Sequence, residues 1–238
     1  MTGHPDAVAA DPGPDGSDEG GVRPDGADVI RVLIVDDHDM FASSLAVVLG
    51  AEDDMRVVGT AGTARAAVDK AGLLAPDVIL LDQRLPDGDG VALIGPLLAV
   101  RTDLQVVMLT ASTSDHILVS AIEAGAAGFI DKSRSVAEVV SAVRSAAAGE
   151  SLVSPKLLAR LLPRLRRQEG GRVDALTERE REVLGYLADG LSNADIAAKM
   201  TVSVHTVRNH IVNLSAKLGA HSKLEALAIA VRKGLISY

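Results

Sequence analysis

The stretch IRVLIVDDHDMF, residues 30–41, decides the fold class. Its first half, together with Val29, is a nearly continuous apolar run, which is typical of a strand buried on both faces of a parallel sheet. Asp36 and Asp37 follow at the carboxyl end, the edge of an open α/β sheet at which ligands bind. Two adjacent carboxylates suit a hard divalent ion such as Mg²⁺. This stretch alone leaves open a second interpretation, an acidic turn in which Asp39 caps the next helix.

Strand-like and helix-like segments alternate beyond this stretch. The expected strands are 29–35, 55–60, 77–82, 104–110 and 127–131. Alanine-rich amphipathic stretches lie between and after them, at 40–50, 63–74, 90–101, 113–124 and 135–148. Five βα repeats predict a flavodoxin-like α/β fold with a doubly wound parallel sheet. Gly95-Pro96 is expected to kink or delay the third helix.

Charge is unevenly spread along the 238 residues, although the total is −8. Residues 1–28 carry seven acidic residues and one arginine and are rich in Gly and Pro, so we expect a disordered acidic tail. The net charge is −8 over 29–152, +4 over 153–174 and +2 over 175–238. This asymmetry predicts two domains with different partners, at 29–150 and 175–238, joined by a basic linker at 151–174.

The composition also excludes several classes of protein. There is no cysteine, which excludes disulfides, zinc–thiolate sites and thiol chemistry. No apolar run approaches the roughly 20 residues that span a bilayer. The acidic N-terminus has no hydrophobic segment of the signal-peptide type. We therefore expect a soluble, cytoplasmic protein without a membrane partner.

Polar residues also end the other predicted strands, with Asp82 after the third, Thr110 after the fourth and Lys132 after the fifth. In a doubly wound fold these ends converge with Asp36 and Asp37. Asp82 can then act as a nucleophile on a phosphoryl group and form an acyl phosphate. The three aspartates can hold Mg²⁺, which neutralises charge on the transferring group. Lys132 supplies a positive charge, and the Thr110 hydroxyl a hydrogen bond, to the phosphoryl oxygens.

Residues 29–150 resemble the receiver domain of two-component response regulators over its whole length. The matching motifs are Asp36-Asp37, the D-x-x-L-P-x-x-x-G pattern from Asp82 to Gly90, Thr110-Ala111 and Lys132. The resemblance implies that a histidine kinase phosphorylates Asp82 in a Mg²⁺-dependent reaction. It also implies that Phe129 is the aromatic switch residue, which turns inward as Thr110 moves toward the phosphoryl group. Gln83 departs from the family, which more often has an apolar or basic residue there, and this position can alter dephosphorylation.

Residues 175–238 predict a compact all-α domain of four short helices. Capping patterns place the helix starts at Thr177, Ser192, Ser203 and Ser222. The stretch LSNADIAAKMTVSVHTVRNHIVNLSAKLG, residues 191–219, reads as helix, short turn, helix, with Gly219 ending the second helix. The apolar stripe of that second helix follows 3, 4, 3, 4 spacing at Val204, Val207, Ile211, Leu214 and Leu218.

The opposite face of the second helix is mostly polar. It presents His205, Arg208, Asn209, Val212, Asn213 and Lys217. Such a face can be solvated surface and nothing more. Arg and Asn near the start of a helix are, however, what base readout in the major groove of double-stranded DNA requires.

Residues 176–236 resemble the LuxR-type helix-turn-helix of NarL/FixJ-family regulators. The matching pieces are Leu176-Thr177-x-Arg179-Glu180-x-Glu182-Val183-Leu184, Gly190-x-Ser192-Asn193-x-x-Ile196-Ala197 and Thr206-Val207-x-x-His210-x-x-x-Leu214-x-x-Lys217-Leu218. The resemblance implies that Arg208, Asn209 and Val212 face DNA bases. It places Thr206, His210 and Lys217 near the DNA backbone or in support of the helix. Because this domain carries only +2, tight binding is expected to need a dimer, with the basic linker as a further source of positive charge.

We interpret the chain as a phosphorylation-controlled, DNA-binding transcription regulator of a two-component system, and not as an enzyme. A cognate sensor histidine kinase is expected to phosphorylate Asp82 and so promote homodimerisation and promoter binding. Before that step, the acidic receiver is expected to obscure the DNA-binding domain or hold it monomeric.

Two other interpretations explain the sequence less well. A haloacid-dehalogenase-like phosphatase also uses an Asp nucleophile with Mg²⁺, but it carries D-x-D after its first strand, whereas Asp36 and Asp37 are adjacent. A degenerate receiver that only binds other proteins would not need the full acidic set together with Thr110 and Lys132.

Overall fold

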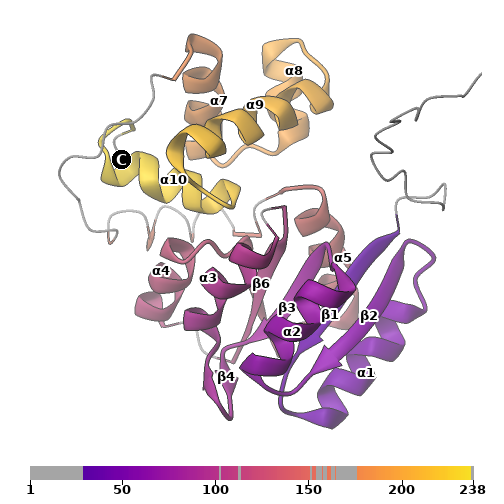
Figure 1. Cartoon of the computed structure of the whole chain (residues 1–238). Helices are drawn as coiled ribbons and strands as arrows, with labels where there is room; N and C mark the ends of the chain where they lie inside the picture. The colour runs from indigo at the N-terminus through magenta and orange to yellow at the C-terminus, as the bar shows by residue number, and fades with distance from the viewer. Residues whose placement is uncertain are drawn as a thin grey trace, which may run out of the picture.

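The computed structural model describes residues 29–101, 103–111, 114–150, 152–153, 157, 160–161, 164 and 176–236. A sheet flanked by helices forms one part, and a group of short helices forms the other (Figure 1). The predicted acidic tail at 1–28 lies outside the described residues, as does most of the predicted linker at 151–174. Within the described residues, no helix is long and apolar enough to cross a membrane.

A five-stranded parallel sheet confirms the predicted flavodoxin-like fold. Its strands are β1 (Ile30–Val35), β2 (Met55–Ala61), β3 (Val78–Asp82), β6 (Gln105–Thr110) and β7 (Gly128–Asp131). Their order is β2-β1-β3-β6-β7. The chain therefore adds β2 on one side of β1 and then β3, β6 and β7 on the other side, which makes a switch point between β1 and β3. At such a switch point the carboxyl ends of neighbouring strands enclose a crevice, which is where open α/β folds bind ligands.

Helices cover both faces of the sheet. The cluster of α1 (Asp39–Gly50) and α5 (Val136–Ala147) fills one face, and that of α2 (Ala64–Leu74), α3 (Gly90–Val100) and α4 (Asp115–Glu123) fills the other. The central strands are apolar on both faces for this reason, and every residue of β3 is buried. Each fully buried Leu or Ile there contributes about 1.5–3 kcal/mol to stability.

The turn after β3 is more ordered than the sequence suggested. Two short strands, β4 (Arg84–Leu85) and β5 (Gly88–Asp89), form an antiparallel hairpin before α3. Gly90 is required there, because a Cβ atom would lie 2.1 Å from the carbonyl oxygen of Asp82. The helix α3 begins at Gly90, so Pro96 does not delay it. Pro96 lies on the exposed side of α3, where water can satisfy the carbonyl that it leaves without a donor.

The C-terminal part has the four predicted helices, α7 (Glu178–Ala188), α8 (Asn193–Met200), α9 (Val204–Leu218) and α10 (Lys223–Arg232). The capping boxes at Thr177 and Ser192 are complete. The capping box expected from Ser222 and Glu225 at the start of α10 is only half formed. Ser222 caps α10, but the Glu225 carboxylate accepts the backbone N–H of His221 instead of that of Ser222.

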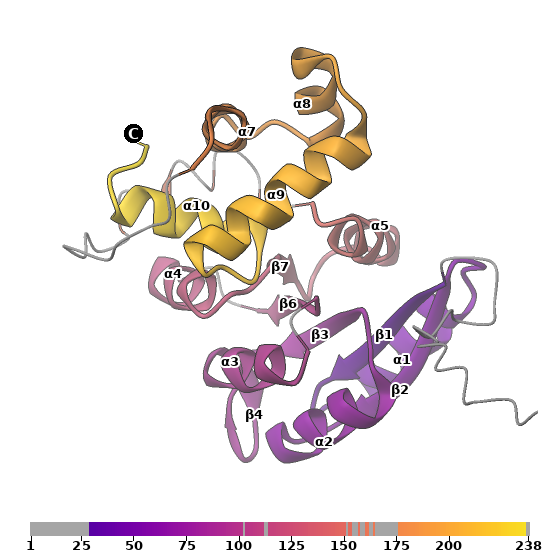
Figure 2. The same cartoon turned by 45° about the horizontal axis from the view of Figure 1, so that its top comes forward.

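The two parts are packed together through α4 and α10, which lie side by side in both views (Figures 1 and 2). Leu118 and Ile122 of α4 belong to the same apolar cluster as Leu224 and Leu227 of α10. Since Ala121 of α4 packs toward the sheet, this helix contacts the cores of both parts. A movement of α4 would therefore alter the packing of the helical domain.

Candidate functional site

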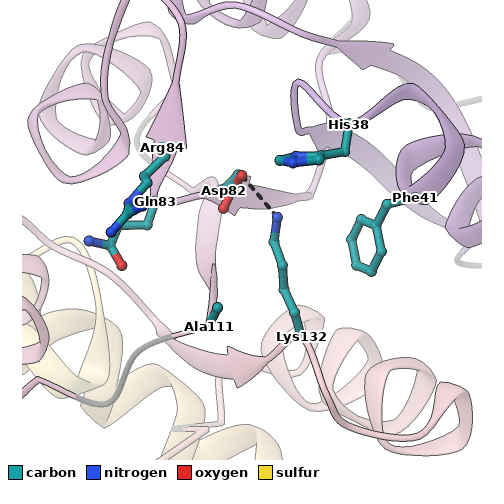
Figure 3. Close-up of a pocket in the computed structure, with 7 residues that line it drawn as sticks. All are labelled: His38, Phe41, Asp82, Gln83, Arg84, Ala111 and Lys132. Carbon is teal, nitrogen blue, oxygen red and sulfur yellow. Dashed lines mark ion pairs between the residues drawn. The ribbon is translucent and has the colours of Figure 1, made fainter.

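Two of the predicted strand-end residues, Asp82 and Lys132, line one pocket at the carboxyl edge of the sheet (Figure 3). We call it the strand-end pocket; it is lined by His38, Phe41, Asp82, Gln83, Arg84, Ala111 and Lys132. Lys132 Nζ lies 2.6 Å from Asp36 Oδ2 and 2.9 Å from Asp82 Oδ2. Asp36 and Asp82, which are 46 positions apart in the sequence, thus share the ammonium of Lys132, and both are almost fully buried.

The ammonium of Lys132 compensates part of the negative charge in and beside the strand-end pocket. Burial works against the charged form of Lys132, but hydrogen bonds and attraction from Asp36 and Asp82 outweigh it, so the pKa of this lysine lies above its ordinary value. The Phe41 ring centroid lies 5.0 Å from Lys132 Nζ, a cation–π contact that also fixes the ammonium. Lys132 therefore remains a cation at neutral pH, facing Asp82.

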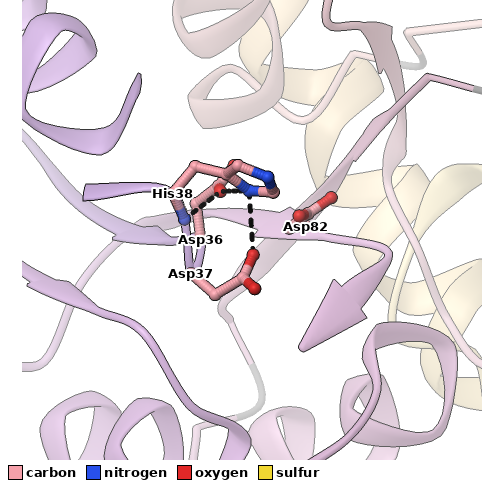
Figure 4. Close-up of side chains that lie close together, drawn as sticks. All are labelled: Asp36, Asp37, His38 and Asp82. Carbon is pink, nitrogen blue, oxygen red and sulfur yellow. Dashed lines mark hydrogen bonds and ion pairs between the residues drawn. The ribbon is translucent and has the colours of Figure 1, made fainter. Parts of the chain in front are cut away.

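The acidic residues in and beside the strand-end pocket fit a hard divalent cation. Ligand atoms of Asp36, Asp37, His38 and Asp82 all lie within 4.8 Å of one another (Figure 4). Asp37 is exposed, so its carboxylate can turn toward an ion that keeps several waters, as Mg²⁺ does. Asp39 lies in the first turn of α1 and does not cap it; His38 is at the N-cap position without a side-chain cap bond.

His38 was not predicted as a site residue. Its Nδ1 atom lies 3.0 Å from Asp36 Oδ1 and 2.9 Å from Asp37 Oδ1. The sequence offered only its position directly after the aspartate pair. Phe41 was missed as well, because nothing in the periodicity of the first helix marks it as a neighbour of Lys132.

Thr110 ends β6 beside the pocket and is buried. Its hydroxyl donates a hydrogen bond of 3.2 Å to Gln83 Oε1. Phe129, the predicted switch residue, is partly buried on β7 and packs against two apolar clusters, that of α2, α3 and α4 and that of the helical domain. The residue thus lies where the two parts of the molecule meet.

The outer face of α9 is turned to solvent. Arg208, Asn209 and Asn213 are exposed, and the Val212 side chain is 64% exposed. Thr206 is partly buried and its N–H donates to the N-cap oxygen of Ser203. The apolar stripe of α9 is buried as predicted, apart from Val204, which is 38% exposed at the first turn.

Lys217 lies apart from the other predicted DNA contacts. Its Nζ atom lies 2.8 Å from Glu180 Oε2, and Glu180 is buried in the first turn of α7. Burial raises the pKa of Glu180, but the hydrogen bond from Lys217 and those from Thr177 outweigh it, so the pKa lies below its ordinary value. Lys217 therefore ties α9 to α7.

Comparisons with known proteins match both parts of the chain. A family model described as the response regulator receiver domain matches residues 32–144. A second model, for bacterial regulatory proteins of the luxR family, matches residues 174–230. The two matches fall on the sheet domain and on the helical domain.

Several curated and solved proteins are similar along most of their length. The chain is 38% identical over 204 residues to the DNA-binding transcriptional activator DevR/DosR of Mycobacterium tuberculosis, covering 85% of this chain and 94% of that protein. It is 33% identical over 211 residues to the transcriptional regulatory protein LiaR of Bacillus subtilis, covering 88% and 100%.

Two solved structures share the fold. The signal receiver domain of the response regulator NarL from Mycobacterium tuberculosis is 32% identical with a TM-score of 0.50, covering 52% of this chain and 99% of that one. The RcsB response regulator of Salmonella typhimurium is 24% identical with a TM-score of 0.51, covering 84% and 97%.

Proposed function

The chain belongs to the response regulators that join a receiver domain to a LuxR-type DNA-binding domain, and from this premise we propose that Asp82 is the residue that accepts the phosphoryl group. The observation that carries the proposal is the position of Asp82 in the strand-end pocket, 2.9 Å from Lys132 Nζ. Among the pocket carboxylates, Asp36 is fully enclosed at the side chain, whereas Asp82 lines the opening. Asp82 is thus the buried carboxylate that a donor can reach.

The transfer follows from this geometry. A carboxylate oxygen of Asp82 attacks phosphorus, and a new P–O bond forms while the P–N bond of the kinase phosphohistidine breaks. The leaving imidazole keeps the electron pair of that bond and takes up a proton. Lys132 offers its ammonium to the phosphoryl oxygens, and Thr110 can offer its hydroxyl proton.

We assign the metal site to Asp36, Asp37 and Asp82, whose oxygen ligands suit Mg²⁺. When bound, Mg²⁺ supplies positive charge that offsets the charge on the transferring group. An imidazole is a poor ligand for Mg²⁺, so His38 would not hold the ion. It would have to turn away from Asp36 and Asp37 so that their oxygens could bind the ion. The protein acts in this proposal as a regulator that is modified, and not as an enzyme that turns over a substrate.

Intact mass spectrometry tests the acceptor assignment. The parent chain, incubated with acetyl phosphate and Mg²⁺, should gain one phosphoryl group, and Asp82→Asn should gain none. Asp131→Asn is a matched control, because Asp131 also ends a strand at this edge but its carboxylate accepts hydrogen bonds from Ser133. Persistent incorporation in Asp82→Asn would refute the assignment.

We also propose that Arg208, Asn209, Val212 and Asn213 read bases in the major groove, as a recognition helix does. Their exposure on α9 supports this proposal. Thr206 and Lys217 would lie near the DNA backbone or support the helix, and the ion pair of Lys217 with Glu180 favours the supporting role for Lys217. Two copies of the domain, joined in a homodimer, would engage half-sites one helical turn apart. Binding to chromosomal DNA would require the protein to be in the cytoplasm.

The contact between the two domains supports control of DNA binding by the receiver. Ser222 Oγ donates to the carbonyl of Ala126 at 3.0 Å, and Lys223 Nζ lies 3.0 Å from Glu150. Arg232 of α10 also lies 3.5 Å from Glu123 of α4. In both ion pairs the receiver supplies the acid and the helical domain the base, as the charge asymmetry predicts.

This contact narrows how the receiver could restrain DNA binding. It covers α10 and leaves the outer face of α9 exposed. The receiver would therefore not restrain DNA binding by covering the base-reading side chains. It would fix the orientation of the helical domain and so hinder the pairing of two copies. Phosphorylation that moves Thr110, Phe129 and α4 would loosen this contact.

Fluorescence anisotropy at fixed salt tests the coupling. A fragment spanning 150–238 should bind DNA equally well with and without beryllofluoride and Mg²⁺. The full chain should gain roughly 5- to 150-fold in affinity, the usual range of an allosteric coupling of about 1–3 kcal/mol. If the full chain binds as tightly as the fragment, and phosphodonor changes neither affinity nor oligomeric state, control by the receiver is wrong.

A further inference from the structure

Gln83 stands directly after Asp82 and makes a contact that the phosphorylation chemistry above does not use. Its side-chain oxygen accepts the hydroxyl proton of Thr110 at 3.2 Å, and its side chain lines the strand-end pocket (Figure 3). A glutamine can make this contact, whereas an apolar residue at the same position cannot.

The contact competes with the role of Thr110 toward a phosphoryl group. A threonine hydroxyl has one proton to donate. Ionised phosphoryl oxygens only accept hydrogen bonds, and Gln83 Oε1 is also an acceptor. The Thr110 hydroxyl can therefore donate to Gln83 or to a phosphoryl group on Asp82, but not to both.

The surroundings make this exchange a local one. The backbone of Gln83 is fixed on both sides, since its N–H donates to the carbonyl of Leu109 and its carbonyl accepts the N–H of Gly90. The Gln83 side chain is only partly buried, so water can satisfy its amide once Thr110 turns away. Thr110 is buried and needs a polar partner in either arrangement.

We propose that Gln83 is a positioning residue that holds the Thr110 hydroxyl away from Asp82 and so sets the threshold for switching. The inference rests on the proposed function, in which Asp82 carries the phosphoryl group and Thr110 moves toward it. Breaking the Gln83–Thr110 bond is then part of the free energy that phosphorylation must supply. A chain with an apolar residue at this position would switch more readily.

A double-mutant cycle with beryllofluoride tests this inference on the full chain. Gln83→Met keeps the side-chain length and exchanges the amide oxygen for a thioether sulfur, which is only a weak acceptor, and Thr110→Val keeps the shape and removes the donor. Binding of beryllofluoride at saturating Mg²⁺ is followed by the ¹⁹F signal of the bound fluoride. Because a hydrogen bond contributes about 0.5–1.5 kcal/mol net, Gln83→Met should bind about 2- to 12-fold more tightly than the parent chain.

The same change should have no effect once Thr110 is absent. In the Thr110→Val background, Gln83→Met should alter the affinity by less than about 1.5-fold, a non-additivity that a merely structural role of Gln83 would not produce. Unchanged or weaker binding by Gln83→Met, or an equal gain in both backgrounds, would overturn the inference. Absence of any modification of the parent chain at Asp82 would instead overturn the proposed function.

Discussion

The strand-end pocket and the outer face of α9 hold their polar side chains in opposite ways. In the pocket, Asp36 and Asp82 are nearly inaccessible and share the ammonium of Lys132. On α9, Arg208 and Asn209 extend into solvent. The pocket therefore has part of its negative charge compensated within the chain by Lys132, whereas the α9 face is compensated only by solvent in the free protein.

This difference has an energetic consequence. Removing one member of a buried charge cluster leaves the others desolvated and unpaired, which costs several kcal/mol. Removing an exposed side chain changes the free energy of unfolding little, and its effect is seen only in the free energy of DNA binding. Mutations in the pocket should thus affect stability and chemistry together, while mutations on the α9 face should affect DNA binding alone.

The largest expected effect is that of Lys132→Met, which leaves Asp36 and Asp82 facing each other. Without a divalent ion at pH 7, urea unfolding should show the receiver destabilised by about 3 kcal/mol. Adding Mg²⁺ should recover part of the loss, because the ion binds the folded chain. Exposed Arg56 gives the control, with Arg56→Met expected to cost less than about 0.5 kcal/mol. Equal stability of Lys132→Met and the parent chain would contradict the compensation of charges in the pocket.

A mutation of Lys217 tests whether this residue stabilises the helical domain or contacts DNA. The residue pairs with the buried Glu180, which favours the stabilising role. Lys217→Met should destabilise the helical domain by about 1.5–3 kcal/mol, as loss of a hydrogen bond to a charged group does. The pKa of Glu180 is lower in the folded protein, so the stabilisation is present above its ordinary pKa of 4.5 and is lost as the pH falls below it. Denaturation at pH 7 and at acidic pH should therefore show a smaller difference at acidic pH.

Exposed Arg181 of α7 provides the control for Lys217. Arg181→Met should leave stability within about 0.5 kcal/mol of the parent chain. If Lys217→Met is as stable as this control but lowers the salt slope of DNA binding by about one, Lys217 is a phosphate contact and belongs to the α9 face.

Arg208 tests the α9 face itself. Arg208→Ala should cost about 1–3 kcal/mol of specific DNA binding and relax the base preference, with no loss of stability. Arg208→Lys separates charge from geometry, because lysine keeps the charge and lacks the planar fork that binds guanine. It should retain affinity for random DNA and lose most of the preference for the specific site. Equal losses on specific and random DNA would exclude a base-reading role.

The smallest effect is expected at Glu150, which links the receiver to the helical domain. Glu150 accepts the backbone N–H of Asn193 and pairs with Lys223. Glu150→Gln keeps an acceptor and removes the charge, so DNA affinity without phosphodonor should rise about 2- to 5-fold, as expected for a partly exposed ion pair. Glu182→Gln, which removes the partner of Arg179 within α7, should leave it unchanged. A lower affinity of Glu150→Gln would argue against a restraining contact.

The predicted strands and helices were confirmed to within one or two residues. Period-two and period-3.6 patterns arise between neighbours in the chain, so IRVLIV at 30–35 reveals a buried strand without knowledge of its partners. The meeting of Asp36, Asp82 and Lys132 was also predictable, because parallel strands bring their carboxyl ends to one edge. The hairpin of β4 and β5 was missed, since each strand has only two residues and no period.

The sequence by itself thus determined the two domain folds, the residues at the strand ends and the faces of α9. Only the tertiary structure decided which side chains form hydrogen bonds or ion pairs, Gln83 with Thr110 and Lys217 with Glu180, and which helices pack together, α10 against α4. The physical reason is one of range. Periodicity and capping depend on residues a few positions apart, whereas these contacts depend on the rotamers and surface shapes of segments that only the folded chain brings together.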